Sequence, residues 1–496
     1  MTIRKFQMLV DGAWIDAASG RTYESRYPAT GEVWSVLPDA DEADADRAVR
    51  AADAAFRSAA WRGLTATARG KLLRGLGDLV AENAGELAEL ETQDNGKLIR
   101  ETRGQLAYLP EFFHYCGGLA DKLEGSTLPI DKADMMAFTI HEPLGVVAAI
   151  IPWNSPLYLT AIKLAPALAA GNTLVIKPSE HASASILRFA ALVEEAGFPA
   201  GVVNVVTGLG PSAGAALTRH PLVRRIAFTG GPATARHVIR ASAENFAKLS
   251  LELGGKSANI VFDDADLESA VNGAVAGIYA ASGQSCVAGS RLLVQDGIYD
   301  RFVAALTERM ARIRIGDPLD PESDMGPMAT EHQLGVVETM VDRAREEGAE
   351  VLAGGKRHAG RHAGSGGWYY EPTLLACESD QMDVVQNEVF GPVAALMRFR
   401  TDAEALALAN GTQYALASGV WTRDIGRAHR FVRDVHAGIV WVNTYRAVSA
   451  MAPIGGYGAS GYGREGGIHS VLDYTELKTV WINLSEQPMG DPFVMR

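Results

Sequence analysis

Cysteine and basic charge are the scarce features of this sequence. Its 496 residues include three cysteines, Cys116, Cys286 and Cys377. Three scattered thiols cannot form a disulfide framework and lack metal-site spacing, so we expect no metal site and a reducing, cytoplasmic location. Lysine and arginine together number 46 against 59 acidic residues, which gives a net charge of −13. This acidic balance argues against a nucleic-acid partner.

Long apolar runs are lacking as well. No run is long enough and sufficiently free of charge to span a bilayer, so we expect no membrane partner. The stretch Met1–Val10 has no apolar core of the kind found in signal peptides. The composition, 47% hydrophobic and 21% charged, is that of a globular protein. The length predicts two or three domains with ample core.

Strands and helices alternate through most of the chain. The segment 146–151 is an almost continuous apolar run, which is typical of a parallel strand buried on both faces. The pattern predicts a doubly wound α/β sheet, in which ligands bind beyond the carboxyl ends of the strands. The predicted strands in the first half are 146–151, 173–176, 202–206, 225–228 and 248–251, and those in the second half are 258–261, 291–294, 350–353, 418–421 and 438–443.

One thiol lies where the chain can present it to a ligand. The stretch Gly283-Gln284-Ser285-Cys286 lies between a predicted helix over 266–280 and the strand 291–294. A cysteine at such a junction is accessible in a way that one inside a helix is not. The alternative interpretation is a buried structural cysteine, because a free thiol packs as a small hydrophobe.

Four other polar stretches have features of an active site. Asn154 follows the strand 146–151, where its amide can point at a developing oxyanion. Lys177 and Glu180 follow the strand 173–176 and can each hydrogen-bond a ribose hydroxyl. Glu252 stands between two leucines and is followed by two glycines, and the stretch 388–392 places an acid and an aromatic before a turn. Each stretch alone also fits a turn, a helix cap or a surface charge.

Taken together, these stretches are specific to one family. With the late stretches 453–457 and 460–465, the sequence resembles the aldehyde dehydrogenase superfamily over essentially its whole length. The resemblance implies an α/β fold with a Rossmann-type cofactor domain, an α/β catalytic domain and a small β bridging and oligomerisation arm. The implied domains are 1–120 with 144–254 for NAD binding, 255–471 for catalysis, and 121–143 with 472–496 for the arm. In the family a partner subunit completes the arm's sheet, which implies a homodimer or homotetramer.

The resemblance also implies the reaction, the NAD(P)-dependent oxidation of an aldehyde to a carboxylic acid. Cys286 would form a thiohemiacetal and then a thioester, with Asn154 and the Cys286 backbone N–H holding the oxyanion. Glu252 would activate the hydrolytic water, with a pKa raised by its apolar neighbours. Lys163 and Glu465 occupy positions that the family can use as a proton path, although a structural ion pair is an equal interpretation.

Two other functions are compatible with such a fold. Acylating members of the family transfer the thioester to coenzyme A and typically lack the glutamate that matches Glu252, so its presence favours water as the acceptor. A non-catalytic structural protein on this fold would be expected to have lost Cys286, Glu252 or Asn154, and all three are present.

The cofactor residues follow from the same resemblance. Glu180 should repel a 2′-phosphate, so NAD is favoured and NADP remains possible. The family usually has a Gly-Ser-Thr-x-x-Gly motif where this chain has residues 230–235, which lack the serine and end in Ala235. The implied cofactor residues are Ile151, Pro152, Trp153, Lys177, Ser179, Glu180, Gly208, Phe228, Gly230, Gly231, Leu253, Gly254, Gln333, Glu388 and Phe390.

The implied substrate pocket has small side chains where small-aldehyde members often have aromatics. We therefore expect a wide pocket for a bulky or polar aldehyde, such as a semialdehyde or cyclic intermediate from catabolism. Arg446 can hold a carboxylate of the substrate, and the alternative is a surface arginine paired with an acid. The implied pocket residues are Ser155, Ile162, Ala280, Ser285, Val287, Arg446, Val448 and Ile454.

Overall fold

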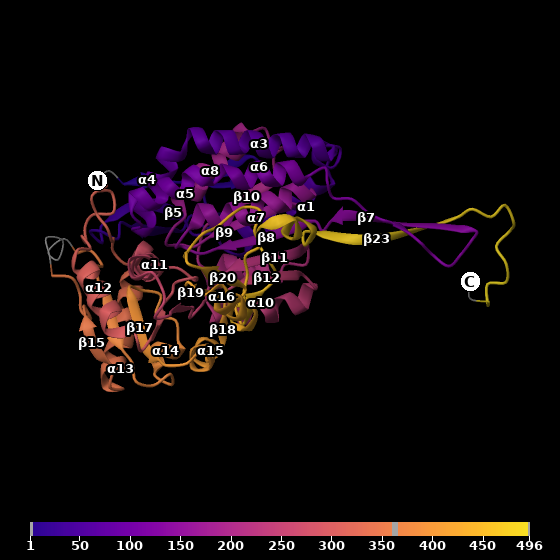
Figure 1. Ribbon diagram of the computed structural model, residues 1–496. Helices are drawn as coiled ribbons and strands as arrows, with labels where there is room; N and C mark the ends of the chain where they lie inside the picture. Colours follow the sequence, from indigo (N-terminus) through magenta and orange to yellow (C-terminus); the bar gives the residue numbers. More distant parts are fainter. Residues whose placement is uncertain (1–2, 360–365, 495–496) are drawn as a thin grey trace.

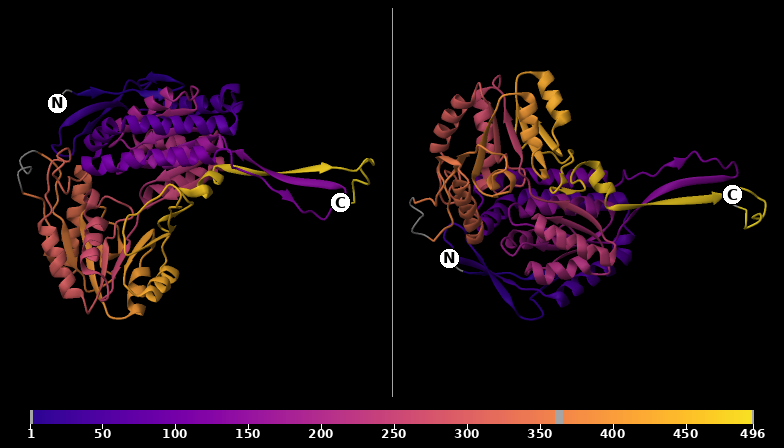
Figure 2. Two further views of the ribbon diagram at one scale, coloured as in Figure 1. Left: turned by 45° about the horizontal axis from the view of Figure 1, so that its top comes forward. Right: turned by 90° about the horizontal axis from the view of Figure 1, so that it is seen from below.

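Two open β-sheets form the body of the molecule, and a long β-arm projects from it (Figure 1). The structure, a computed structural model, describes residues 3–359 and 366–494. Within these ranges the first sheet has eight strands and the second has seven. The arm stays separate from the body in two further orientations (Figure 2).

The first sheet is built around five parallel strands, as the alternating pattern predicts. β2 adds antiparallel to β10 at one end, and β22 adds antiparallel to β12 at the other. The β2–β3 hairpin turns at Asp11 and Gly12, both of which have positive φ. The strand order is β22 (Gly461–Tyr462), β12 (Lys248–Glu252), β11 (Val223–Thr229), β8 (Val146–Ile151), β9 (Thr173–Pro178), β10 (Val203–Val205), β2 (Met8–Val10) and β3 (Ala13–Ile15).

Both faces of this sheet are covered, which explains the continuous apolar run of β8. Val147 and Ala149 pack into one core, and Val146 and Ala148 pack into the core on the opposite face. The helices of the first core include α3 (Ala66–Glu82), α4 (Ala84–Asn95), α5 (Ile99–Tyr108), α6 (Pro110–Leu119), α7 (Pro156–Ala170) and α8 (Ala184–Glu195). The helices of the second core are α1 (Glu42–Arg57), α9 (Ala215–Arg219) and α10 (Pro232–Asn245).

The second sheet contains two strands that the sequence pattern did not reveal, β16 and β17. β17 reads Val-Ala-Ala-Leu-Met-Arg-Phe, and its alanine, leucine and methionine have no strand preference of their own. Its place between β14 and β16 makes it a strand, because the sheet supplies its hydrogen bonds on both sides. The order is β15 (Glu350–Ala353), β16 (Thr373–Ala376), β17 (Val393–Phe399), β14 (Arg291–Gln295), β13 (Ala258–Val261), β19 (Ala417–Trp421) and β20 (Ile439–Val442).

Helices cover the second sheet as well, and several short elements complete the structure. A segment expected in the catalytic domain supplies β22 of the first sheet, where Gly461 pairs with Glu252. The covering helices are α11 (Leu267–Ile278), α12 (Tyr299–Ala311), α13 (Glu331–Glu346), α15 (Asp402–Asn410) and α16 (Ile425–Asp434). The short elements are β1 (Arg4–Lys5), β4 (Thr22–Arg26), β5 (Val33–Pro38), α2 (Ala59–Arg62), α14 (Asp383–Gln386), β18 (Tyr414–Ala415), β21 (Tyr457–Gly458) and α17 (Gly467–Leu472).

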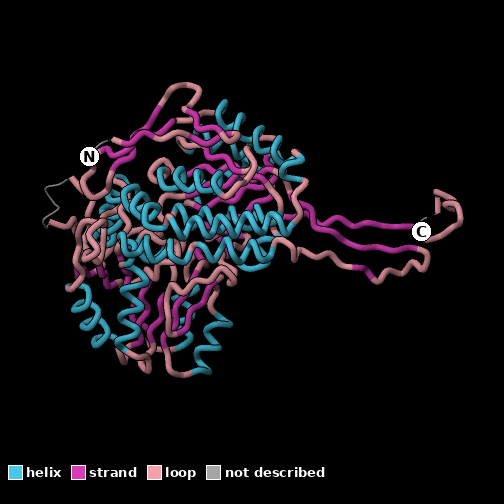
Figure 3. Tube along the Cα trace, turned by 90° about the horizontal axis from the view of Figure 1, so that it is seen from above, coloured by secondary structure: helices cyan, strands magenta, loops and turns pink. Residues whose placement is uncertain are grey.

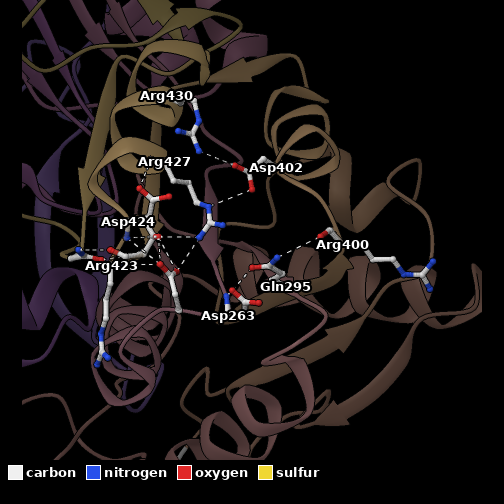
Figure 4. A network of polar contacts seen from close by, with 11 residues as sticks. Asp263, Gln295, Arg400, Asp402, Arg423, Asp424, Arg427 and Arg430 are labelled. Atoms are coloured by element: carbon white, nitrogen blue, oxygen red, sulfur yellow. Dashed lines mark hydrogen bonds and ion pairs between the residues drawn. The ribbon is translucent and has the colours of Figure 1, made fainter.

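A polar network fixes the amino end of α16 against this sheet (Figure 4). Arg427 lies between the carboxylates of Asp264, at 3.2 Å, and Asp402, at 3.4 Å. Arg430 contacts the same Asp402 at 3.4 Å. The contacts join helices α15 and α16 to the loop after β13.

The arm consists of β7 (Met135–Pro143), paired antiparallel with β23 (Thr475–Asn483), and the short β6 (Thr127–Leu128). The tube view shows the strands running away from all helices (Figure 3). Residues 135–143 of the predicted arm segment 121–143 thus pair with residues 475–483 of the tail, and residues 495–496 lie outside the described part. Leu477 and Trp481 leave more than half of their surface exposed, at 61% and 54%.

Within the described ranges, no helix is long and apolar enough to cross a membrane. The same residues contain no group of three or more His, Cys, Asp or Glu side chains that could hold a metal ion.

Candidate active site

A cavity of about 420 Å³ contains Cys286, Glu252 and Asn154 in its walls. It lies where the carboxyl ends of β11 and β12 meet the cysteine loop, helix α5, helix α7 and the loop after β20. Of the predicted substrate-pocket residues, Ala280 is not among those that line it. The predicted residues that do line it are Ser155, Ile162, Ser285, Val287, Arg446, Val448 and Ile454.

The cysteine loop has an unusual backbone that brings Cys286 to the cavity. Ala281 and Ser282 both have φ of 52°, and Gly283 has φ of 71°. This left-handed region is costly for residues with a Cβ, so surrounding contacts must hold the loop. A side chain at Gly283 would place its Cβ 2.0 Å from the Gly391 carbonyl oxygen, which explains the glycine. The loop therefore needs a glycine at position 283.

The Cys286 thiol is protonated in the protein alone. Burial raises its pKa to about 12, and the nearby carboxylates of Glu388 and Glu252 add to the effect. The backbone N–H groups of Val287 and Cys286 act in the opposite direction. Because the thiolate is the nucleophilic form, a base must remove this proton before or during attack.

Asn154 lies beside the cysteine loop, between β8 and α7. Its side-chain amide donates a 3.1 Å hydrogen bond to the Gln284 carbonyl oxygen. The buried Lys97 ammonium group donates to the Asn154 carbonyl oxygen at 3.3 Å and to the Ser155 hydroxyl at 2.7 Å. The backbone N–H of Leu157 donates to the Glu91 carboxylate at 3.3 Å. These contacts hold the backbone of the segment 154–157 in place.

Glu252 ends β12 and is buried, with 6% of its surface exposed. Burial raises the pKa of its carboxyl well above the usual value, and the negative charge of Glu465 raises it further. The positive charges of Lys163 and Arg464 lower it in part. Its Oε1 atom has no hydrogen-bond partner within the described residues. Lys163 and Glu465 form a buried ion pair behind it. A carboxyl group with a raised pKa and a free oxygen is suited to accept a proton.

The predicted cofactor residues gather at one edge of the first sheet. They follow the carboxyl ends of five neighbouring strands: β8 precedes 152–153, β9 precedes 179–180, β10 precedes 208, β11 precedes 230–231 and β12 precedes 253–254. Three further predicted cofactor residues are each among the last two residues of a strand: Ile151, Lys177 and Phe228. A doubly wound sheet binds nucleotides at this edge.

The edge has features that fit a dinucleotide. Gly231 is the N-cap of α10 without a side-chain cap, and a Cβ there would contact nothing within 4 Å. The free N–H groups of this helix end suit a phosphate, even though the family serine is replaced by Gly231. Lys177 lies 3.5 Å from Glu180, so both can reach the same sugar.

A second group of predicted cofactor residues faces this edge from the other half. Phe390 packs edge-to-face on Trp153 with ring centroids 5.3 Å apart. Gln333 donates to the carbonyl oxygens of Val389 and Phe390 at 2.9 and 3.1 Å, and so supports this segment. Glu388 accepts a 3.0 Å hydrogen bond from the Gly255 N–H, and burial raises the pKa of its carboxyl to about 7.

Several cavity residues were not predicted from the sequence, because they do not lie at strand ends. Helix α5 and the loop before it contribute Lys97, Glu101, Gln105 and Tyr108, which recur at helical spacing on one face. That polar stripe on an otherwise ordinary helix was the available signal. The other missed residues are Gly104, Tyr158, Leu159, Thr229, Ile439 and Trp441.

Comparison with known proteins identifies the class that this fold and site define. Residues 14–480 match the model of the aldehyde dehydrogenase family, and the chain belongs to that family. It is therefore an oxidoreductase that oxidises an aldehyde with NAD(P).

Individual relatives cover the whole chain. The (Z)-2-((N-methylformamido)methylene)-5-hydroxybutyrolactone dehydrogenase of Acinetobacter baylyi is 53% identical over 100% of both chains. The crystal structure of PnpE from Pseudomonas sp. WBC-3 is 46% identical, with a TM-score of 0.96 over 99% of this chain and 100% of that one; PnpE has also been solved with nicotinamide adenine dinucleotide. Betaine aldehyde dehydrogenase of Staphylococcus aureus with NAD+ is 39% identical, with a TM-score of 0.96 over 99% of both chains.

Proposed function

We propose that Cys286, Asn154 and Glu252 carry out the hydrolytic oxidation of an aldehyde in the cavity. Glu252 takes the thiol proton as the sulfur adds to the carbonyl carbon. The Asn154 amide and the Cys286 backbone N–H hold the resulting oxyanion of the thiohemiacetal. NAD(P) supplies the hydride acceptor, which leaves a thioester on Cys286.

Hydrolysis of the thioester uses the same carboxylate again. Glu252 first loses its proton, and the ion pair of Glu465 with Lys163 behind it is a path for that proton. The ionised carboxylate then takes a proton from water as the water oxygen attacks the thioester, and the acid leaves. The raised pKa of Glu252 favours its acceptance of a proton, first from the thiol and later from water.

The first-sheet unit binds NAD(P) in this proposal, and the second-sheet unit carries Cys286. Lys177 and Glu180 hold the adenosine ribose, and the amino end of α10 holds the pyrophosphate. Glu388 and Phe390 hold the nicotinamide ribose and ring. The Glu180 carboxylate favours NAD over NADP, because it repels a 2′-phosphate.

One observation supports this assignment above the others: three chemically distinct groups from different elements meet in one cavity. The test is Cys286→Ser, assayed by NADH absorbance with a panel of aldehydes and by a direct measurement of NAD binding. Turnover should vanish while the dissociation constant for NAD stays within a few-fold of the wild type. Substantial residual oxidation by the variant contradicts the role of Cys286.

The substrate in this proposal is an aldehyde that carries a carboxylate, or its cyclic form. The Acinetobacter baylyi relative is named for a 5-hydroxybutyrolactone. Such a ring is the closed form of an aldehyde acid, and its opening releases an aldehyde and a carboxylate together. Arg446 lines the cavity, and its guanidinium donates to the Ala276 carbonyl oxygen at 3.2 Å. It forms no ion pair with any described residue. This guanidinium can bind the carboxylate.

Arg446→Ala tests the substrate class. The variant should raise KM for acidic aldehydes far more than for neutral ones, because it removes one charged hydrogen bond worth about 1.5–3 kcal/mol. Steady-state rates with 4-oxobutanoate and with its methyl ester measure the difference. Equal effects on both substrates, or acetaldehyde as the preferred substrate of the wild type, contradict the proposal.

The assembly is a homodimer or a tetramer built of dimers in which arms pair with a second copy. The exposed apolar side chains of β23 and the free edges of the arm support this proposal. The three cysteines are free, in keeping with a reducing cytoplasm.

A further inference from the structure

The wall of the candidate active-site cavity contains a hydroxyl group that the reaction does not use. Tyr158 is on α7, four residues after Asn154, and lines the cavity together with Cys286 and Glu252. Its hydroxyl oxygen is buried and has no hydrogen-bond partner among the residues that the structure describes. A buried, unpartnered hydroxyl costs free energy unless a ligand satisfies it.

Aromatic packing fixes the position of this hydroxyl. The Tyr158 ring packs edge-to-face on Phe112, with centroids 5.3 Å apart and planes at 87°. Phe112 in turn packs edge-to-face on Tyr108, at 5.9 Å and 89°. The ring therefore cannot swing to another acceptor without breaking its contact with Phe112, which Tyr108 in turn holds in place.

Tyr108 shows what a satisfied hydroxyl looks like in the same wall. It also lines the cavity, but its hydroxyl accepts a 3.0 Å hydrogen bond from the Ala450 backbone N–H. The two tyrosines thus have the same chemistry and the same aromatic neighbour, and they differ in whether the protein supplies a partner for the oxygen.

The Tyr158 hydroxyl keeps its proton at all ordinary pH values. Burial raises the pKa of the phenol well above its usual value, and the charges of Glu465, Cys286 and Glu252 raise it further. A phenol that stays protonated offers one O–H donor. These acidic groups belong to the reacting end of the cavity.

We propose that Tyr158 determines substrate specificity by donating a hydrogen bond to an oxygen of the aldehyde substrate other than the reacting carbonyl. The inference rests on the proposed function and assigns Tyr158 a role separate from that of Arg446. The reacting oxygen already has the Asn154 amide and the Cys286 N–H. An alkyl chain that fills the cavity leaves the Tyr158 donor buried without an acceptor, and sites of this kind reject substrates that lack the matching group.

The selected class is an aldehyde with an oxygen acceptor close to its carbonyl, whether charged or neutral. A carboxylate, an ester carbonyl and a lactone carbonyl all provide that acceptor. Arg446 discriminates by charge, so it does not distinguish a neutral ester from an alkyl chain. The two residues therefore predict different patterns across one set of substrates.

The test compares methyl 4-oxobutanoate with hexanal, two neutral aldehydes with chains of six atoms. Wild-type enzyme should have the higher kcat/KM for the ester. In Tyr158→Phe, kcat/KM for the ester should fall about 3- to 10-fold, while that for hexanal stays constant or rises, because a neutral hydrogen bond is lost from one substrate alone. A thermal unfolding curve checks that the variant keeps its fold.

Tyr108→Phe is the matched control, and its effect should be the same for both aldehydes. A wild-type preference for hexanal overturns the proposal without any variant. An unchanged ratio of ester to hexanal in Tyr158→Phe, or an equal loss for both substrates, also overturns it and leaves the proposed function intact. A wild type that oxidises neither aldehyde nor 4-oxobutanoate contradicts the proposed substrate class as well.

Discussion

Left-handed backbone at residues other than glycine is concentrated around the candidate active site. Ala281 and Ser282 precede the candidate catalytic cysteine, Phe390 is in the predicted nicotinamide segment, and Arg446 lines the cavity, with φ between 52° and 62°. Asn443, with φ of 53°, begins the loop that carries Arg446. Such positions are costly and persist where the surroundings enforce them. Their placement supports a site whose loops are held in position before any ligand binds.

Glu388 gives the site a predictable dependence on pH. Burial raises the pKa of its carboxyl to about 7, although the Gly255 N–H and the Lys256 cation both act to lower it. It is therefore protonated below pH 7 and ionised above, and a ribose hydroxyl donates more strongly to the ionised form. NAD should bind about 5-fold more tightly at pH 8 than at pH 6.

Equilibrium titration of NAD between pH 6 and 8 measures this effect, with Glu388→Gln as the control. The amide does not titrate, so NAD affinity in this variant should not tighten as pH rises over the same range. Lys256, whose pKa burial lowers to about 7, loses its charge in this window and works in the opposite direction. A wild-type affinity that weakens as pH rises contradicts the assignment of Glu388.

Residues at strand ends were the predictable part of the candidate site. Asn154, Glu252 and the cofactor residues each follow a strand whose apolar run is visible in the sequence, and parallel strands bring their carboxyl ends to one edge. Tyr158 and Lys97 were not predictable in this way. Their positions in the wall depend on how α7 and α5 pack, which no local pattern specifies.

At the scale of elements, most strands and helices follow from local pattern, and the exceptions have a physical reason. β17 is composed largely of alanine, leucine and methionine, and β16 spans four residues, so neither has a strong signal of its own. Both are strands because neighbours in the second sheet take up their hydrogen bonds. β22 likewise has two residues and exists because Gly461 fits against β12.

The arm offers a test of assembly at this scale. Leu477 and Trp481 alternate along β23 on one exposed face. Replacing both by glutamate places charge where an apolar face would be buried between subunits, so the oligomer should dissociate to monomers. Light scattering at micromolar concentration measures the mass.

Lys478→Gln is the matched control for the arm, because it changes charge on the opposite face of the same strand and should leave the mass unaltered. A monomeric wild type, or an unaltered oligomer in the double glutamate variant, removes the arm from the interface.

At the scale of the whole molecule, the two sheets divide the work and meet at the cavity. The first sheet supplies Glu252 and the cofactor edge, and the second supplies the loop of Cys286 through β13 and β14. β22 crosses from the second half to pair with β12 beside Glu252. In the proposed mechanism the base and the nucleophile come from different sheets, so both sheets must be placed correctly for the thioester to form and to be hydrolysed.

In the proposed mechanism a thioester forms on Cys286, and Glu252 drives its hydrolysis. The most direct measurement is a stopped-flow experiment on Glu252→Gln with an aldehyde substrate and NAD, followed by mass spectrometry of the quenched protein. We predict a burst of NADH that rises more slowly than in the wild type, because the amide cannot take the thiol proton, but that still approaches one equivalent per subunit. Turnover afterwards should be slower still, and the peptide that contains Cys286 should carry the mass of the acyl group. An unchanged steady-state rate, or the absence of an acyl group on that peptide after a full burst, would contradict this mechanism.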